Sequence, residues 1–87
     1  MATVWIPSLM RDLTGGQESV EAPGQTVGQV IAALERAYPG LQVRLCEGDR
    51  LNPVIVARVD GKVARLGLSE AVEEHSEIHF LPAIAGG

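Results

Sequence analysis

The clearest helical pattern in the chain lies at residues 26–40, which read TVGQVIAALERAYPG. Thr26 followed by Gln29 is the pattern of a capping box, in which Thr26 accepts a hydrogen bond from a free helical amide and Gln29 reaches back. Apolar residues then recur at helical spacing on one face: Val27, Val30, Ile31, Leu34 and Ala37 or Tyr38. We expect the helix to stop at Tyr38-Pro39-Gly40, because the residue before a proline is pushed out of the α region.

Strand patterns precede this helix. Residues 3–6 (TVWI) are β-branched or aromatic, with Val4 and Ile6 on one face and Thr3 and Trp5 on the other. Pro7 ends that run, and residues 12–16 (DLTGG) have the composition of a turn. Residues 19–21 then predict a short return strand, so the chain is expected to begin with a hairpin.

More strand patterns follow the helix. Residues 41–53 hold Gly48, Asp49, Asn52 and Pro53 among apolar residues, and we expect a loop there with up to one helical turn. Residues 54–59 (VIVARV) predict a strand, Asp60-Gly61 favours a tight hairpin turn, and residues 62–64 predict the returning strand. Residues 77–81 predict the last strand, which Pro82 ends by removing a donor.

The order β-β-α-β-β-β predicts an α+β fold, a mixed sheet packed on one main helix. A chain of 87 residues makes one domain, and with 46% hydrophobic and 21% charged residues it is expected to fold by itself. The net charge of -4 gives no basic field for phosphates, so neither nucleic acid nor a membrane surface is an expected partner. A single cysteine and the lack of a signal peptide or membrane-spanning run predict a cytoplasmic protein.

Candidate catalytic residues do not form a recognisable site. His75 and His79 lie near Glu73, Glu74 and Glu77, but a metal site needs ligands that converge from separate elements. Nucleotide-binding glycine motifs are absent from the sequence, and its serines have no nucleophile setting. Cys46 is read as a buried or incidental small apolar residue rather than a reactive thiol. We therefore expect no metal, no bound cofactor and no catalytic activity of the chain itself.

The end of the chain, LPAIAGG, is the most informative stretch for function. Gly86 and Gly87 contribute little to a core, and Ala83, Ile84 and Ala85 carry no polar side chain. An extended tail of residues 83–87 spans about 17 Å, so it can thread a narrow channel in a partner and present its terminal carboxylate. A carboxylate is a poor electrophile, which means that an activating enzyme must first convert it to a mixed anhydride.

Three stretches carry a family resemblance: VWIPSLMRDLTGG at residues 4–16, TVGQVIAALERAYPG at residues 26–40 and IHFLPAIAGG at residues 78–87. Together they resemble the β-grasp, ubiquitin-like sulfur carriers, a group with the small subunit of molybdopterin synthase and the carrier of the thiamine pathway. Within the group, the chain most resembles the actinobacterial-type carriers of cysteine biosynthesis. The resemblance implies a β-grasp domain at residues 1–82 and a flexible tail at residues 83–87.

The resemblance also implies a function. Gly87 would be adenylated by a ubiquitin-activating-like enzyme that uses ATP, and then sulfurated to a thiocarboxylate. A synthase would take the sulfur; in the cysteine branch this is a pyridoxal-phosphate enzyme, and a peptidase releases the product. The chain would be a protein co-substrate, with Ala83, Ile84, Ala85 and Gly86 threading into partner active sites.

Strand alternation predicts where partners dock. If Ile78 and Phe80 face the helix, Leu81 faces outward just before the tail, and Trp5 and Val56 also face outward. We expect these three residues to form an apolar patch for partner contact. Two alternative functions stay open besides the carrier: a ubiquitin-like modifier that forms isopeptide bonds through Gly87, and a plain interaction module. The metabolite that receives the sulfur, whether cysteine, molybdopterin, thiamine or another product, also stays open.

Overall fold

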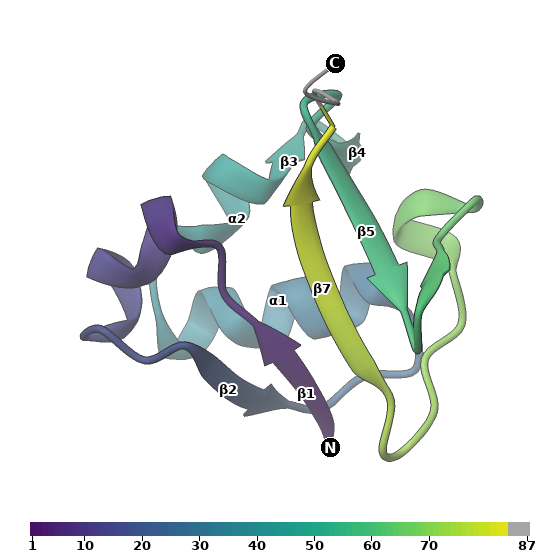
Figure 1. The fold of residues 1–87 in the computed structure, drawn as a ribbon, viewed down its shortest axis with the longest axis horizontal. Helices are drawn as coiled ribbons and strands as arrows, with labels where there is room; N and C mark the ends of the chain where they lie inside the picture. The colour runs from purple at the N-terminus through teal and green to yellow at the C-terminus, as the bar shows by residue number, and fades with distance from the viewer. Residues whose placement is uncertain (84–87) are drawn as a thin grey trace.

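A computed structural model describes residues 1–83, in which helix α1 (Val27–Ala37) covers one face of a mixed sheet (Figure 1). Within these residues the larger sheet has five strands, in the order β2-β1-β7-β5-β6. Strand β1 runs parallel to β7, and the other neighbours are antiparallel. The predicted α+β fold, with a mixed sheet packed on one main helix, is confirmed. The strands are β1 (Ala2–Trp5), β2 (Ser19–Ala22), β5 (Ile55–Val59), β6 (Lys62–Val63) and β7 (Glu77–Pro82).

Helix α1 begins as its sequence predicts. The Thr26 side chain accepts a hydrogen bond from the backbone N–H of Gln29 at 3.2 Å, and the Gln29 side chain accepts one from the backbone N–H of Gln25 at 2.8 Å. The return bond thus ends one residue before the position of an ideal capping box. Tyr38 caps the other end, where the helix stops before Pro39 as predicted.

The core lies between this helix and the inner face of the sheet. Four apolar residues of α1 are fully buried at the helical spacing that the sequence predicts, and they pack in one cluster with alternate residues of β7 and of residues 4–6, in and just after β1. The members of that contact are Val27, Val30, Ile31, Leu34, Val4, Ile6, Ile78 and Phe80. Ala37 is exposed, whereas Tyr38 is half-buried and packs against this cluster, so Tyr38 is the last residue of the apolar face. The opposite face of the sheet is left open.

The first hairpin contains a helix that the sequence pattern did not reveal. Strands β1 and β2 pair antiparallel as predicted, but the 3-10 helix η1 (Ser8–Thr14) fills the connection between them. Thr14 is buried, and its hydroxyl lies 3.2 Å from the Arg11 carbonyl and 2.9 Å from the Gln17 carbonyl. Gly15 then takes a left-handed conformation with φ of 66°, which glycine adopts without steric cost.

The expectation for residues 41–53 is wrong in part, because they are more regular than a loop. They form helix α2 (Leu41–Leu45) and a small hairpin of β3 (Cys46–Glu47) and β4 (Arg50–Leu51). Leu41 and Leu45 lie four positions apart and are both buried. The Glu35 carboxylate from α1 accepts hydrogen bonds from the backbone N–H groups of Gly40 and Gln42, at 3.1 Å and 2.9 Å. These tertiary contacts stabilise a helix too short to form alone.

The second hairpin follows its turn signal. Asp60 and Gly61 both have positive φ, 52° and 84°, as a primed two-residue turn requires. Strand β6 is one residue shorter than predicted, although the N–H of Ala64 still donates to the carbonyl of Ala57 at 2.8 Å. A short 3-10 helix, η2 (Gly67–Ser69), follows, and the chain then returns along β7.

Candidate functional site

The point at which the tail leaves the domain is set by the pairing of β7 with the start of β5. Pro82 lies opposite Ile55, and the N–H of Ala83 donates to the carbonyl of Val54 at 2.8 Å. Val54 is itself held by a turn, because its N–H donates to the Asn52 side chain at 3.0 Å. Asn52 therefore positions the backbone on which the tail begins, a role that its place in a predicted loop did not indicate.

The other tail residues named from the sequence, Ile84, Ala85, Gly86 and Gly87, lie outside the described residues. Ala83 is the last described residue and is half-buried. Its bond to Val54 joins it to the sheet, while the division into a domain at residues 1–82 and a tail at residues 83–87 stays a prediction. Among residues 1–83, the candidate site is thus the surface around the base of the tail.

The open face of the sheet carries the three residues expected to contact partners. Leu81 is 39% exposed and lies directly opposite Val56, which is half-buried. Trp5 lies opposite His79, and the two rings stack with centroids 5.5 Å apart and planes 7° from parallel. Trp5 and Leu81 line the same surface groove, about 360 Å³ in volume. The predicted outward phase of all three side chains agrees with the structure; their role in partner contact stays a prediction.

Two apolar residues that the sequence reading missed extend this surface. Leu9 is 87% exposed and Val54 is 59% exposed, and both line a second groove of about 260 Å³ together with Leu81 and Pro82. Nothing in the sequence marks Leu9 as exposed, because its orientation depends on the 3-10 helix η1. The apolar surface at the tail base is therefore larger than the alternation of the strands alone predicts.

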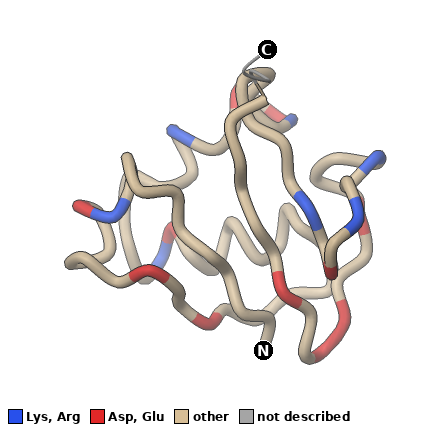
Figure 2. Tube along the Cα trace, in the orientation of Figure 1, with Lys and Arg blue, Asp and Glu red and all other residues tan. Residues whose placement is uncertain are grey.

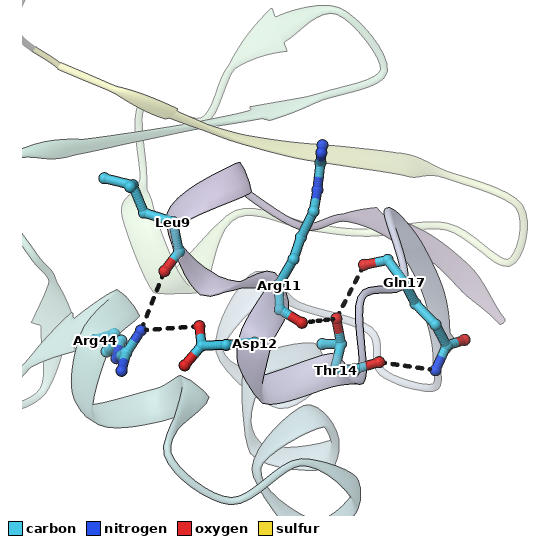
Figure 3. Close-up of polar contacts among 6 residues, drawn as sticks. All are labelled: Leu9, Arg11, Asp12, Thr14, Gln17 and Arg44. Atoms are coloured by element: carbon cyan, nitrogen blue, oxygen red, sulfur yellow. Dashed lines mark hydrogen bonds and ion pairs between the residues drawn. The ribbon is translucent and has the colours of Figure 1, made fainter.

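Polar contacts hold Leu9 and η1 in place (Figure 3). The Arg44 guanidinium, from α2, donates to the Leu9 carbonyl at 3.2 Å and lies 3.5 Å from the Asp12 carboxylate. Arg11 donates through Nε to the carbonyl of Ile6 at 3.1 Å. Two cations thus fix the backbone of η1 against β1 and α2, which orients the exposed Leu9 side chain beside the tail base.

The titratable groups do not assemble a catalytic site in the described part of the chain. Residues 1–83 contain no group of three or more His, Cys, Asp and Glu side chains that could hold a metal ion. His75 is exposed, whereas His79 is half-buried against Trp5, so the two histidines do not converge. Cys46 is half-buried, and burial raises the pKa of its thiol, which disfavours the nucleophilic thiolate.

Residues 4–87 match the ThiS family. The sulfur carrier protein CysO of Mycobacterium tuberculosis is 39% identical over 90 residues, an alignment that covers 98% of this chain and 97% of that protein. The chain belongs to the ThiS family. The predicted membership of the β-grasp sulfur carriers is thereby confirmed.

Solved structures agree with the assignment of this chain to the ThiS family. The structure of a BexX/CysO complex from Amycolatopsis orientalis contains a chain that is 37% identical, with a TM-score of 0.92 and full coverage of both chains. The small archaeal modifier protein SAMP1 of Methanosarcina acetivorans is 26% identical, with a TM-score of 0.78, and the match covers 99% of this chain and 95% of that one. The Mycobacterium tuberculosis relative is named a sulfur carrier protein, and the Methanosarcina acetivorans protein is named a modifier protein.

One further feature concerns membranes. Among the residues that the structure describes, no helix is both long and apolar enough to cross a bilayer.

Proposed function

We propose that this chain carries sulfur as a thiocarboxylate on the terminal carbonyl of Gly87. The observation that supports the proposal best is the combination of ThiS-family membership with a sheet that ends at an anchored Ala83. Beyond Ala83 the sequence has four residues without a polar side chain, and four extended residues span about 14 Å. That length is enough to carry the terminal carboxylate into a partner's active site while the domain stays outside.

The chemistry requires two steps at Gly87. In the first, a carboxylate oxygen attacks the α-phosphate of ATP on an adenylating enzyme, and pyrophosphate leaves. In the second, a sulfur nucleophile attacks the carbonyl carbon of the acyl adenylate, and AMP leaves. The chain itself supplies only the reacting carboxylate and the docking surface, so ATP is bound by the partner. Glycine at the last two positions leaves no Cβ to obstruct either attack.

The partner surface in this proposal is the apolar patch of Trp5, Val56 and Leu81, extended by Leu9 and Val54. Leu9, Val54 and Leu81 are exposed beside the base of the tail, and the half-buried Trp5 and Val56 adjoin them on the open face of the sheet, which supports this assignment. A patch of exposed apolar residues next to a functional segment is a common mark of a protein contact. The adenylating enzyme and the sulfur-accepting synthase would use this surface in turn, because both must reach the same carboxylate.

The likeness to CysO supports an acceptor in the biosynthesis of cysteine or another sulfur-containing metabolite. In the cysteine case the acceptor would be a pyridoxal-phosphate synthase, and a peptidase would release the product from the carrier. That the Amycolatopsis orientalis CysO is found in a complex with BexX supports recognition by a separate partner protein. A role as the small subunit of molybdopterin synthase would use the same thiocarboxylate chemistry at Gly87 and is less favoured.

A second candidate function is protein modification, which the likeness to SAMP1, named as a modifier, supports. A modifier and a carrier share the activation of Gly87 and differ in the nucleophile that follows. A carrier yields a thiocarboxylate, whereas a modifier yields an amide to a lysine of another protein.

Intact mass spectrometry tests the proposal. The chain is incubated with ATP, sulfide and its adenylating enzyme, and a variant that ends at Ala85 is the control. We expect a mass gain equal to the exchange of one oxygen for sulfur in the full chain and no gain in the control. Absence of that gain, with an enzyme that sulfurates another carrier, would refute the carrier proposal; high-molecular-weight conjugates in cell extracts would then favour the modifier.

A further inference from the structure

The open face of the sheet is organised in three rows that cross the strands. Nearest the tail, Val56 lies opposite Leu81. In the next row Trp5 lies opposite His79, and His79 lies opposite Arg58. Residues two positions apart on a strand share a face and lie about 7 Å apart, so these rows follow one another along the sheet. The row by the tail is apolar, and the middle row is aromatic and basic.

The third row, farthest from the tail, is acidic. Glu21 of β2 lies opposite Thr3, and Thr3 lies opposite Glu77 of β7. Asp60 continues the row, because its N–H donates to the Glu77 carbonyl at 2.8 Å. We call Glu21, Glu77 and Asp60 the acidic row. Figure 2 shows Asp and Glu gathered towards the end of the molecule where the N-terminus lies. Two row spacings separate the acidic row from Leu81, a distance of about 14 Å.

No lysine or arginine of the described residues neutralises the acidic row. All three residues of the row are exposed, and none of them has an ion pair to Lys or Arg in residues 1–83. The same face holds Arg58, but its guanidinium donates to the Gly61 carbonyl at 2.8 Å instead of to a carboxylate. Both carboxylate oxygens of Asp60 accept hydrogen bonds within the turn, from the Ser76 hydroxyl and the Glu77 N–H. Glu21 and Glu77 are therefore the carboxylates that can pair with a partner, and they are exposed.

Trp5 links the acidic row to the apolar surface. Its indole N–H donates to the Glu77 carboxylate at 3.2 Å, while its ring stacks on His79. A partner that covers the indole ring therefore also meets Glu77. Beside this pair lies a hollow of about 500 Å³, lined by Glu77, Asp60 and Leu81 together with Arg58 and His79. A lysine or arginine side chain suits the hollow, because its stem can lie along the His79 ring while its charged end meets Glu77.

We propose that the sheet face docks on the adenylating enzyme through two contacts of different chemistry. The apolar row fits an apolar depression beside the channel that receives the tail. The acidic row pairs with lysine or arginine side chains about 14 Å from that channel. This inference rests on the proposed function, and it adds the charge of the partner surface. If the sheet face docked the other way round, its carboxylates would lie on the apolar depression of the enzyme. The two contacts together therefore select the one orientation in which the tail points into the channel.

The test uses the double variant Glu21→Gln and Glu77→Gln in the full chain. Glutamine keeps an acceptor for the Trp5 indole and removes the charge. The control variant, Glu47→Gln with Asp49→Asn, makes the same change in net charge on the separate β3–β4 hairpin. The KM of the carrier and the kcat of ATP-dependent sulfuration are measured at low and high salt, after thermal unfolding has verified that each variant is folded.

We expect the KM of the double variant to rise at least fivefold at low salt, with kcat unchanged because the tail is intact. The difference from wild type should shrink at high salt, since exposed ion pairs are screened. The control variant should keep the wild-type KM within twofold. An unchanged KM in the double variant, an equal rise in the control, or a rise that salt does not reduce would overturn the inference. If wild type is sulfurated and any of these three results is found, the inference about docking fails and the proposed function stands. If wild type gains no sulfur, the inference and the proposed function are both refuted.

Discussion

Asp60 offers a sharp test of the turn that joins β5, β6 and β7. Its carboxylate accepts a hydrogen bond from the Glu77 backbone N–H at 2.9 Å and one from the Ser76 hydroxyl at 2.8 Å. The Glu77 bond, and then the Ser76 bond, lower the pKa of Asp60 below its ordinary value. We therefore predict that Asp60→Asn destabilises the fold in a pH-dependent way. Asparagine tolerates the positive φ of 52° at this position, so the backbone of the turn is retained.

The magnitude follows from the two bonds. The asparagine oxygen can keep one of them, while its NH₂ group cannot accept the other. A hydrogen bond to a charged group contributes roughly 1.5–3 kcal/mol when desolvated, and Asp60 is exposed, so water recovers part of the loss. We expect a loss of about 1 kcal/mol at pH 7, or about 4–8 °C in Tm for a domain of this size.

The sign of the pH effect is fixed by the lowered pKa. Stability from the carboxylate is complete above the unfolded-state pKa, about 3.9 for Asp, and is lost as the pH falls through the folded-state pKa. The gap between wild type and Asp60→Asn should therefore be full above about pH 5 and close as the pH falls below 3.9. Urea unfolding followed by the fluorescence of Trp5, the only tryptophan, measures this gap. Asp49→Asn is the control, because the Asp49 side chain makes no hydrogen bond among the described residues. A gap that stays constant from pH 7 to the acid limit would refute the reasoning.

Three further substitutions test separate parts of the structure. Thr26→Ala removes the acceptor for the Gln29 N–H and should cost about 1 kcal/mol of unfolding free energy in urea titrations; a loss near zero would contradict the cap. Gly24→Ala should be more damaging, because Gly24 has φ of 155° and a Cβ there would lie 2.7 Å from the Val30 nitrogen. We expect Tm to fall by about 10 °C or more, on the scale of about 4–8 °C per kcal/mol. An unchanged Tm would show that this turn rearranges freely. Leu81→Glu should leave Tm within a few degrees of wild type, because the Leu81 side chain is partly exposed. It should weaken binding to the adenylating enzyme about tenfold, or about 1.4 kcal/mol. An unchanged affinity would show that Leu81 is not part of the contact.

Local signals predicted the parts of this protein whose stabilising contacts lie close in sequence. The cap of α1 needs only Thr26 and its neighbours, and the Asp60-Gly61 turn needs only two residues that tolerate positive φ. Alternation along β1 and β7 predicted which side chains face outward, because the period of a strand is two. The stretch LPAIAGG, together with the family resemblance, led to the prediction for Gly87, and the chemistry at Gly87 stays a prediction.

Contacts between distant residues decided the rest. Helix α2 exists because Leu41 and Leu45 are buried and Glu35 holds its first amides, and neither condition can be read from residues 41–53 alone. Alternation predicted that Trp5 faces out, but only the parallel pairing of β1 with β7 places it on His79 and brings its N–H to Glu77. Period-two patterns define the faces of a strand without specifying its neighbours. The sequence was therefore sufficient to predict the role of the tail, whereas the surface at the base of the tail is assembled by the pairing of strands far apart in the chain.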